Sequence, residues 1–124
     1  MTSVVRNVTF DIAAPHAPYE IALFWGQVLG RPVSPEDTPA DDEVGLGGEP
    51  NLLFIRVPKV KTLKNRVHVD LQPDTTPNDE VDRLTRLGAR LIDDQRRPDG
   101  TGWVVLADPA GNEFCVERSA AERA

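Results

Sequence analysis

The sequence predicts an α+β fold of two similar βαβββ modules, each with the order strand, helix and three strands. Three observations predict it: two runs of alternating apolar and polar residues, an apolar helical stripe after each run, and a Leu-Gly pair that ends each stripe. The spacing between matching landmarks is nearly constant, at 61 positions from Asn7 to His68 (68 − 7), 58 from Gly30 to Gly88 (88 − 30) and 61 from Asn51 to Asn112 (112 − 51). A spacing shared by three landmarks favours a repeat over a chance likeness between two segments.

Length and charge limit the domain count and the classes of partner. A chain of 124 residues fits one domain, 1–124, with modules at about 4–58 and 65–118. The net charge of −6 argues against a basic nucleic-acid surface, so we expect no nucleic-acid partner. No apolar run reaches the roughly 18 residues of a membrane span, and the N-terminus lacks a signal peptide, so we expect a cytoplasmic protein without a membrane partner. One cysteine excludes an intrachain disulfide and a multi-cysteine zinc site.

The first module begins with an alternating strand at residues 7–12. A helix follows, because Ile21, Phe24, Trp25 and Val28 form one apolar stripe and Gly30 suits the helix end. Short apolar segments at Val33, 44–46 and 52–57 then predict three strands. The acidic, proline-rich stretch 34–43 joins two of them, either as a lid or as a simple surface loop.

The second module repeats this order. An alternating run at 68–72 precedes a helix with Thr76 as its N-cap and Pro77 at the first helical position. Apolar residues at Val81, Leu84 and Leu87 form its buried stripe, and Gly88 closes it. Strands are expected at 89–92, 103–106 and 114–117, the last two separated by the Asp-Pro-Ala-Gly-Asn turn at 108–112.

Five segments carry a resemblance to a known family: Phe24-Trp25, the first Leu-Gly pair, residues 65–71, Leu87-Gly88-Ala89-Arg90 and residues 102–116. They resemble the vicinal-oxygen-chelate superfamily of glyoxalase I, bleomycin-resistance proteins and extradiol dioxygenases, and especially its glyoxalase-like members. The resemblance is weakest over 34–49. The resemblance implies curled mixed sheets around a cleft and, commonly, a homodimer. It also implies a divalent metal, bound by one side chain from the first and one from the last strand of each module, that polarises substrate oxygens.

The implied ligand positions fall near Asn7, Phe54, His68 and Cys115. Only His68 is a usual ligand of the family, Phe54 cannot coordinate a metal, and Cys115 stands where the family places a glutamate. Glu113 and Glu117 lie two residues to either side of Cys115. Zinc sites normally need three or four good protein ligands, so we expect no bound metal and no cofactor, with a divalent metal as the alternative.

The remaining candidates are ligand-binding residues. Alternation puts His68 and Asp70 on one face, about 7 Å apart along the strand, with Thr9 and Asp11 on the matching face of the first module. These side chains form either the polar floor of a cleft or a solvated sheet face. The strand-borne residues Phe54, Trp103, Cys115 and Arg56 either contact a ligand or belong to the core or surface.

We therefore predict a protein that binds a small organic ligand in a cleft without the usual catalytic metal. The alternative is a metal-dependent or acid/base lyase, isomerase or dioxygenase that uses His68 and a nearby carboxylate. A partner-regulating module without a ligand is the third reading. The sequence identifies neither the ligand nor the pairing of modules within or between chains.

Overall fold

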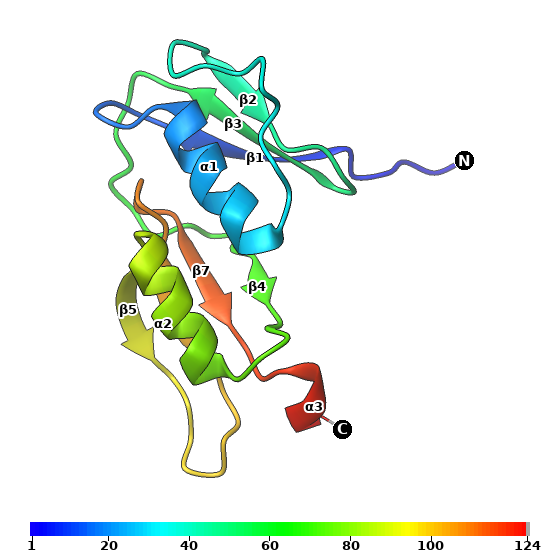
Figure 1. Ribbon diagram of the computed structural model, residues 1–124, viewed down its shortest axis with the longest axis vertical. Coiled ribbons are helices and arrows are strands. Elements are labelled where there is room, and N and C mark those ends of the chain that lie inside the picture. The colour runs from blue at the N-terminus through cyan, green and yellow to red at the C-terminus, as the bar shows by residue number, and fades with distance from the viewer. Residues whose placement is uncertain (124) are drawn as a thin grey trace. The chain divides into compact units, whose positions relative to one another are not determined.

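The computed structural model describes residues 1–123 and separates into two compact units, Met1–Thr62 and a second unit that begins at Leu63 (Figure 1). The first unit contains strand β1 (Asn7–Ile12), helix α1 (Pro18–Leu29), and strands β2 (Glu43–Gly45) and β3 (Asn51–Arg56). Its sheet has the order β1-β3-β2, with β1 parallel and β2 antiparallel to β3. The sequence predicts this combination of one helix and a mixed sheet for the first module.

The core of the first unit lies between this sheet and α1. The predicted stripe of Ile21, Phe24, Trp25 and Val28 is buried, and α1 ends where predicted, at Gly30, whose φ of 69° is left-handed. Phe10 of β1 packs beside Phe54 of β3, with ring centroids 5.1 Å apart. It also lies 5.4 Å from the ring of Trp25, so aromatic contacts join the helix to both strands.

One predicted strand of the first unit is wrong. Residues 31–34, which include Val33, form no strand in the described chain. Pro32 and Pro35 flank Val33 closely, and neither has a backbone N–H to donate to a neighbouring strand. The acidic stretch that follows is held by Arg56, whose Nε donates to Asp42 at 2.9 Å.

The second unit contains β4 (Asp70–Leu71), α2 (Pro77–Leu87), β5 (Arg90–Asp94), β6 (Val104–Ala107), β7 (Glu113–Val116) and a short α3 (Ala120–Arg123). The sheet order is β4-β7-β6-β5, with β4 parallel to β7 and the other pairs antiparallel. All four strands of the predicted module are therefore present. The predicted first strand, 68–72, is shorter than expected, although the N–H of Cys115 still bonds the carbonyl of Val69 at 3.0 Å.

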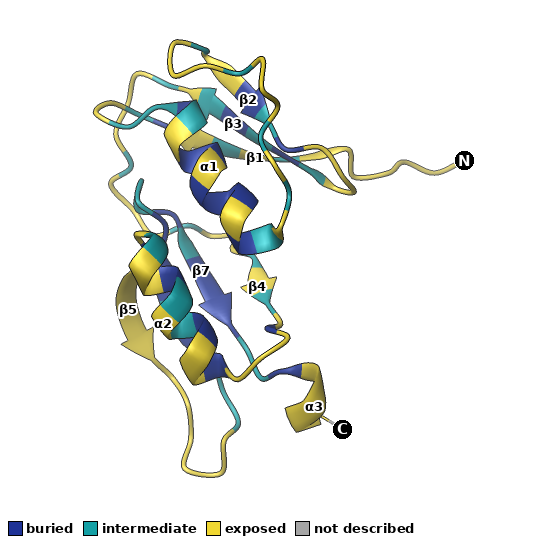
Figure 2. Cartoon of the chain, viewed as in Figure 1, coloured by how far each residue is buried: buried dark blue, intermediate teal, exposed yellow. Residues whose placement is uncertain are grey.

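Helix α2 begins and ends as the sequence predicts. The hydroxyl of Thr76 accepts a hydrogen bond from the N–H of Asp79 at 3.1 Å, and Gly88 ends the helix with a φ of 119°. Figure 2 shows a narrow buried stripe on α2 and a wholly exposed β5 at the edge of the sheet. Leu84 is the one fully buried member of the predicted stripe, while Val81 and Leu87 are half-buried.

The strand registers correct one equivalence between the two units. In the first unit Thr9 pairs with Leu53, and in the second Asp70 pairs with Cys115. Since Thr9 and Asp70 each lie two residues after the first landmark of their module, Leu53 is the counterpart of Cys115. The offset between the last strands is thus 62 (115 − 53), whereas the sequence comparison matched Phe54 to Cys115 at 61 (115 − 54).

The predicted α+β class with two related modules is confirmed by these two mixed sheets and their helices.

Within residues 1–123, no helix combines the length and hydropathy needed to cross a bilayer.

Candidate functional site

A pocket of about 330 Å³ lies on the sheet of the second unit, and all its lining residues belong to that unit. This volume falls at the lower end of the range of small-molecule sites, about 300–1,000 Å³. Three predicted residues, His68, Trp103 and Cys115, line it. Six further residues complete the lining: Lys64, Ile92, Asp93, Gln95, Val105 and Glu113.

A row of four side chains crosses the sheet beneath this pocket. The registers pair Asp93 of β5 with Val105 of β6, Val105 with Cys115 of β7, and Cys115 with Asp70 of β4. Directly opposed residues project from the same face of a sheet, so this row lies on the pocket face. Phe114 and Val116, which alternate with Cys115, are buried on the other face.

An irregularity in β5 supplies one wall of the pocket. The β5–β6 register shifts between Leu91 and Asp93, so that Ile92 is an extra residue in the strand. Leu91 pairs with Leu106, whereas Ile92 and Asp93 both line the pocket. A bulge of this kind redirects a side chain without changing the rest of the ladder. No signal in the sequence marks it, which is why Ile92 and Asp93 were not predicted.

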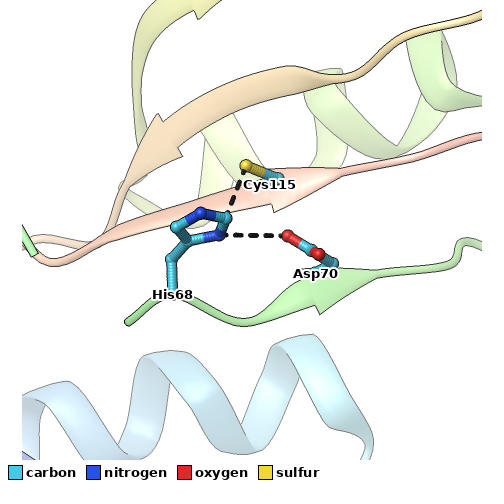
Figure 3. A group of neighbouring side chains, drawn as sticks. All are labelled: His68, Asp70 and Cys115. Carbon is cyan, nitrogen blue, oxygen red and sulfur yellow. Dashed lines mark hydrogen bonds and ion pairs between the residues drawn. The ribbon is translucent and has the colours of Figure 1, made fainter. Parts of the chain in front are cut away.

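His68, Asp70 and Cys115 converge at one end of the row (Figure 3). The imidazole Nδ1 of His68 lies 3.1 Å from Oδ1 of Asp70 and 3.8 Å from Sγ of Cys115. The side chains of His68 and Asp70 remain 37% and 46% exposed, whereas Cys115 is buried. At this end of the row a buried sulfur therefore lies beside two groups that solvent reaches.

Cys115 is a thiol at neutral pH. Burial raises its pKa to about 11, with the negative charge of Asp70 and a hydrogen bond to that carboxylate adding to the effect, while the positive charge of Lys64 opposes it. Because the thiolate is the nucleophilic form, Cys115 is not activated for covalent chemistry.

The predicted candidates of the first unit are not among the residues that line this pocket. The side-chain oxygen of Asn7 accepts a hydrogen bond from Asn51 at 2.9 Å, and Arg56 is paired with Asp42. Thr9 and Asp11 are exposed on β1, as a solvated sheet face would have them. Phe54 is fully buried in the core against Phe10.

The remaining lining residues differ in how far the sequence could have revealed them. Val105 shares strand parity with Trp103, so alternation alone gives it the pocket face. Glu113 shares parity with Cys115, and its carboxylate also accepts the N–H of Asn65 at 3.0 Å. Lys64 and Gln95 lie outside the strands, where periodicity carries no information.

The metal site that the resemblance implies does not fit the first unit. One of its positions is Asn7, whose carbonyl oxygen is already used by Asn51. The other falls on Leu53 by register, a hydrocarbon side chain that cannot coordinate a metal. In the second unit, by contrast, His68, Asp70 and Cys115 each offer one donor atom, and these atoms lie within 4.8 Å of one another.

Comparisons with known proteins agree with this architecture. The glyoxalase-like domain family matches residues 7–117. No curated protein matches the sequence. A glyoxalase/bleomycin resistance/dioxygenase family enzyme from Burkholderia phytofirmans is 18% identical, with a TM-score of 0.64 over 92% of this chain and 97% of that one.

Two fosfomycin resistance proteins named FosX have similar structures. The protein from Mesorhizobium loti is 15% identical, with a TM-score of 0.68 over 99% of this chain and 98% of its own. A mutant of the Listeria monocytogenes protein, in complex with Mn(II) and a dihydroxypropylphosphonic acid, is 12% identical, with a TM-score of 0.69 over 99% and 95% of the two chains. At sequence identities this low, the structural similarity shows that these proteins share a fold with this chain, and it shows nothing further.

Proposed function

The chain belongs to the glyoxalase-like domain family, and from that premise we propose that it binds a small organic ligand in the pocket of its second unit. The observation that carries the proposal is the pocket itself, which has the volume of a small-molecule site and is built by a single unit. The two units fold together as one glyoxalase-like domain in this proposal, with the first unit contributing stability.

The lining suits a ligand with a flat apolar part and a polar end. Ile92, Trp103 and Val105 provide an apolar wall, and Trp103 is 39% exposed. An exposed indole beside an exposed isoleucine offers apolar area that a ligand would remove from water. His68, Lys64 and Gln95 supply the few hydrogen-bonding groups that fix the orientation of a ligand in such sites.

A screen of small organic compounds by thermal shift tests this proposal. A compound that binds the folded chain raises its unfolding free energy by RT ln(1 + [L]/Kd), about 2.7 kcal/mol at a concentration of 100 Kd. We expect Trp103→Ala to lower the affinity of a hit by tenfold or more. The matched control is Leu23→Ala, since Leu23 is also 39% exposed but belongs to α1.

Two results would contradict the proposal. One is a screen in which compounds of many chemical classes leave the unfolding temperature unchanged. The other is a hit whose affinity falls equally in Trp103→Ala and Leu23→Ala, because binding would then not depend on the pocket.

The second candidate is an enzyme of the superfamily, a lyase, isomerase or dioxygenase with an altered site. The convergence of His68, Asp70 and Cys115 beside the pocket favours it. A cation held by these residues would act as a Lewis acid on a ligand oxygen. The Mn(II) bound by the Listeria protein makes this candidate worth testing. Turnover of a pocket ligand that stops on chelation and returns with added metal would support it over simple binding.

We also propose that the working form is a homodimer. Val4, Val5, Leu63 and Val67 are large apolar side chains with 72–88% of their surface exposed. A partner chain that covered these side chains would remove their apolar surface from water. Sedimentation of the purified chain would give twice the monomer mass of 13.6 kDa.

A further inference from the structure

Three side chains gather at the β5 edge of the pocket: Asp93, Gln95 and Trp103. The ladder between β5 and β6, in which Asp93 pairs with Val105, continues beyond the two strands. Its next bond runs from the N–H of Gln95 to the carbonyl of Trp103, at 2.8 Å. Gln95 therefore lies opposite Trp103, and Asp93 lies diagonal to it on the same face. We call these three residues the β5–β6 corner.

The spacing within the corner suits one small group between a ring and a carboxylate. Diagonal neighbours on one face of an antiparallel pair lie about 7–8 Å apart, within reach of a long or aromatic side chain. The indole of Trp103 is 39% exposed, so it can still receive a ligand. A cation within about 6 Å of the centre of an indole ring is attracted to the ring face. The corner thus places an aromatic face and the Asp93 carboxylate within range of the same cation.

The corner keeps the negative charge of Asp93. Its carboxylate accepts a hydrogen bond from the side-chain amide of Gln95, a neutral group. The guanidinium of Arg96, close by in the sequence, donates instead to Asp94 at 2.7 Å and to Asn78 at 2.6 Å. An ionised carboxylate offers about four acceptor sites, so one bond from Gln95 leaves room for a cation.

The one lysine of the lining belongs to the other end of the pocket. The charge of Lys64 acts on the thiol of Cys115, and the neighbouring Asn65 donates its N–H to Glu113 at 3.0 Å. Cys115 is on β7, two strands from β5, and strands about 4.7–4.9 Å apart put it about 9–10 Å from the corner. The whole lining carries two carboxylates and one ammonium group, so a positively charged ligand is favoured.

We infer that the β5–β6 corner receives the charged group of a small organic ammonium compound. The cation lies over the ring of Trp103 and beside Asp93, and the apolar part of the compound covers Ile92 and Val105. This inference rests on the proposed ligand-binding function, and adds to it the class of ligand and the place of its charge. It needs neither a metal nor the thiol.

Three aromatic probes that differ in charge test the inference: benzyltrimethylammonium, benzyl alcohol and benzenesulfonate. Heteronuclear NMR spectra of the nitrogen-labelled full chain contain the indole N–H signals of its two tryptophans, and Trp103→Phe identifies the exposed one. We expect the cation to shift the Trp103 signal with an affinity at least about fivefold above that of benzyl alcohol. Benzenesulfonate should leave the signal unchanged.

Two variants with the same loss of charge locate the effect. Asp93→Asn should weaken binding of benzyltrimethylammonium at least about fivefold, the attraction of two unit charges about 4 Å apart even in bulk water. Its affinity for benzyl alcohol should not change. The matched control is Asp82→Asn, because Asp82 is an exposed carboxylate of α2 outside the pocket lining. This control should bind the cation as the unmodified chain does.

Equal affinity for benzyltrimethylammonium and benzyl alcohol would overturn the inference and leave the pocket standing as a site for neutral compounds. An equal loss of cation binding in Asp93→Asn and Asp82→Asn would also overturn it, since the attraction would then come from the acidic chain as a whole. So would a Trp103 signal that none of the probes shifts. Asp93 is exposed on an edge strand, so Asp93→Asn leaves the core intact.

Discussion

The two units share one strand-helix-strand order but use the matching sheet face differently. The row Asp93–Val105–Cys115–Asp70 crosses the second sheet under a pocket. The matching row of the first sheet is Thr9–Leu53–Gly45. One row therefore offers a thiol and two carboxylates, and the other offers a hydroxyl, a hydrocarbon and a glycine. The difference teaches that side chains at fixed register positions, and not the repeated backbone, determine where chemistry can occur.

The opposite, helix-facing side shows the reverse contrast. The first unit fills it with Phe10, Trp25 and Phe54, and the ring of Phe10 lies 5.4 Å from that of Trp25 and 5.1 Å from that of Phe54. In the second unit the buried stripe of α2 is narrower, with Leu84 at its centre. The first unit thus has the larger aromatic core, and we assign it the greater share of stability.

The largest expected effect concerns that core. Phe54→Ala should lower the free energy of unfolding by about 3–5 kcal/mol, because it removes a fully buried ring and leaves a cavity. Urea denaturation measures the change. Trp103→Ala, on the pocket face of the second unit, should cost less than half as much, since its ring is partly exposed. Equal costs would contradict the proposed division between a stabilising unit and a ligand-binding unit.

A second prediction compares the two rows through thiol chemistry. Because the pKa of Cys115 is about 11, its thiolate fraction is small at pH 8 and rises about tenfold per pH unit up to pH 10. Alkylation by iodoacetamide, followed by mass spectrometry, should rise in step. A chain carrying Leu53→Cys and Cys115→Ala puts the thiol in the matching position of the first unit, beside the uncharged Thr9.

That transplanted thiol should react faster at pH 8, because it is less buried and faces no carboxylate in its row. Asp70→Asn should also speed the reaction of Cys115, since it removes a negative charge that raises the thiol pKa. If neither change affected the rate of alkylation, the difference in charge between the two rows would not influence thiol reactivity.

The smallest expected effect on stability concerns the bulge. Deleting Ile92 leaves Leu91 and Asp93 adjacent, so that they project from opposite faces as they already do. The deletion should change the free energy of unfolding by less than about 1 kcal/mol, because Ile92 is an exposed residue on an edge strand. Binding of a pocket ligand should nevertheless weaken, since one apolar wall is lost. Denaturation and calorimetric titration of the same sample measure the two effects.

The sequence predicts much of the fold because its signals are local. The cap at Thr76, the helix ends at Gly30 and Gly88, and the apolar stripe of α1 each depend on residues within a few positions of one another. The strand at Val33 fails for a reason that is also local, since two prolines flank it. A strand assignment from the apolar pattern alone gives too little weight to the backbone N–H groups that these two prolines lack.

The site is harder to predict, because register and irregularity decide it. Alternation places His68 and Asp70 on one face, yet only the β4–β7 register brings Cys115 beside them and pairs Leu53, rather than Phe54, with Thr9. The bulge at Ile92 depends on pairing with β6, a contact distant in sequence. These features are tertiary, and a single sequence carries no direct signal for them.

Every residue that lines the pocket falls between Lys64 and Cys115, within the second half of the chain. The main effect of harmful random substitutions should therefore differ before and after residue 62, where the first unit ends in the sequence. Before that point harmful substitutions would reduce the amount of folded protein. Beyond it, under the proposed function, many would leave the amount unchanged and alter which ligand is bound, so that one half of the gene could evolve new specificity while the other maintains the yield of folded protein.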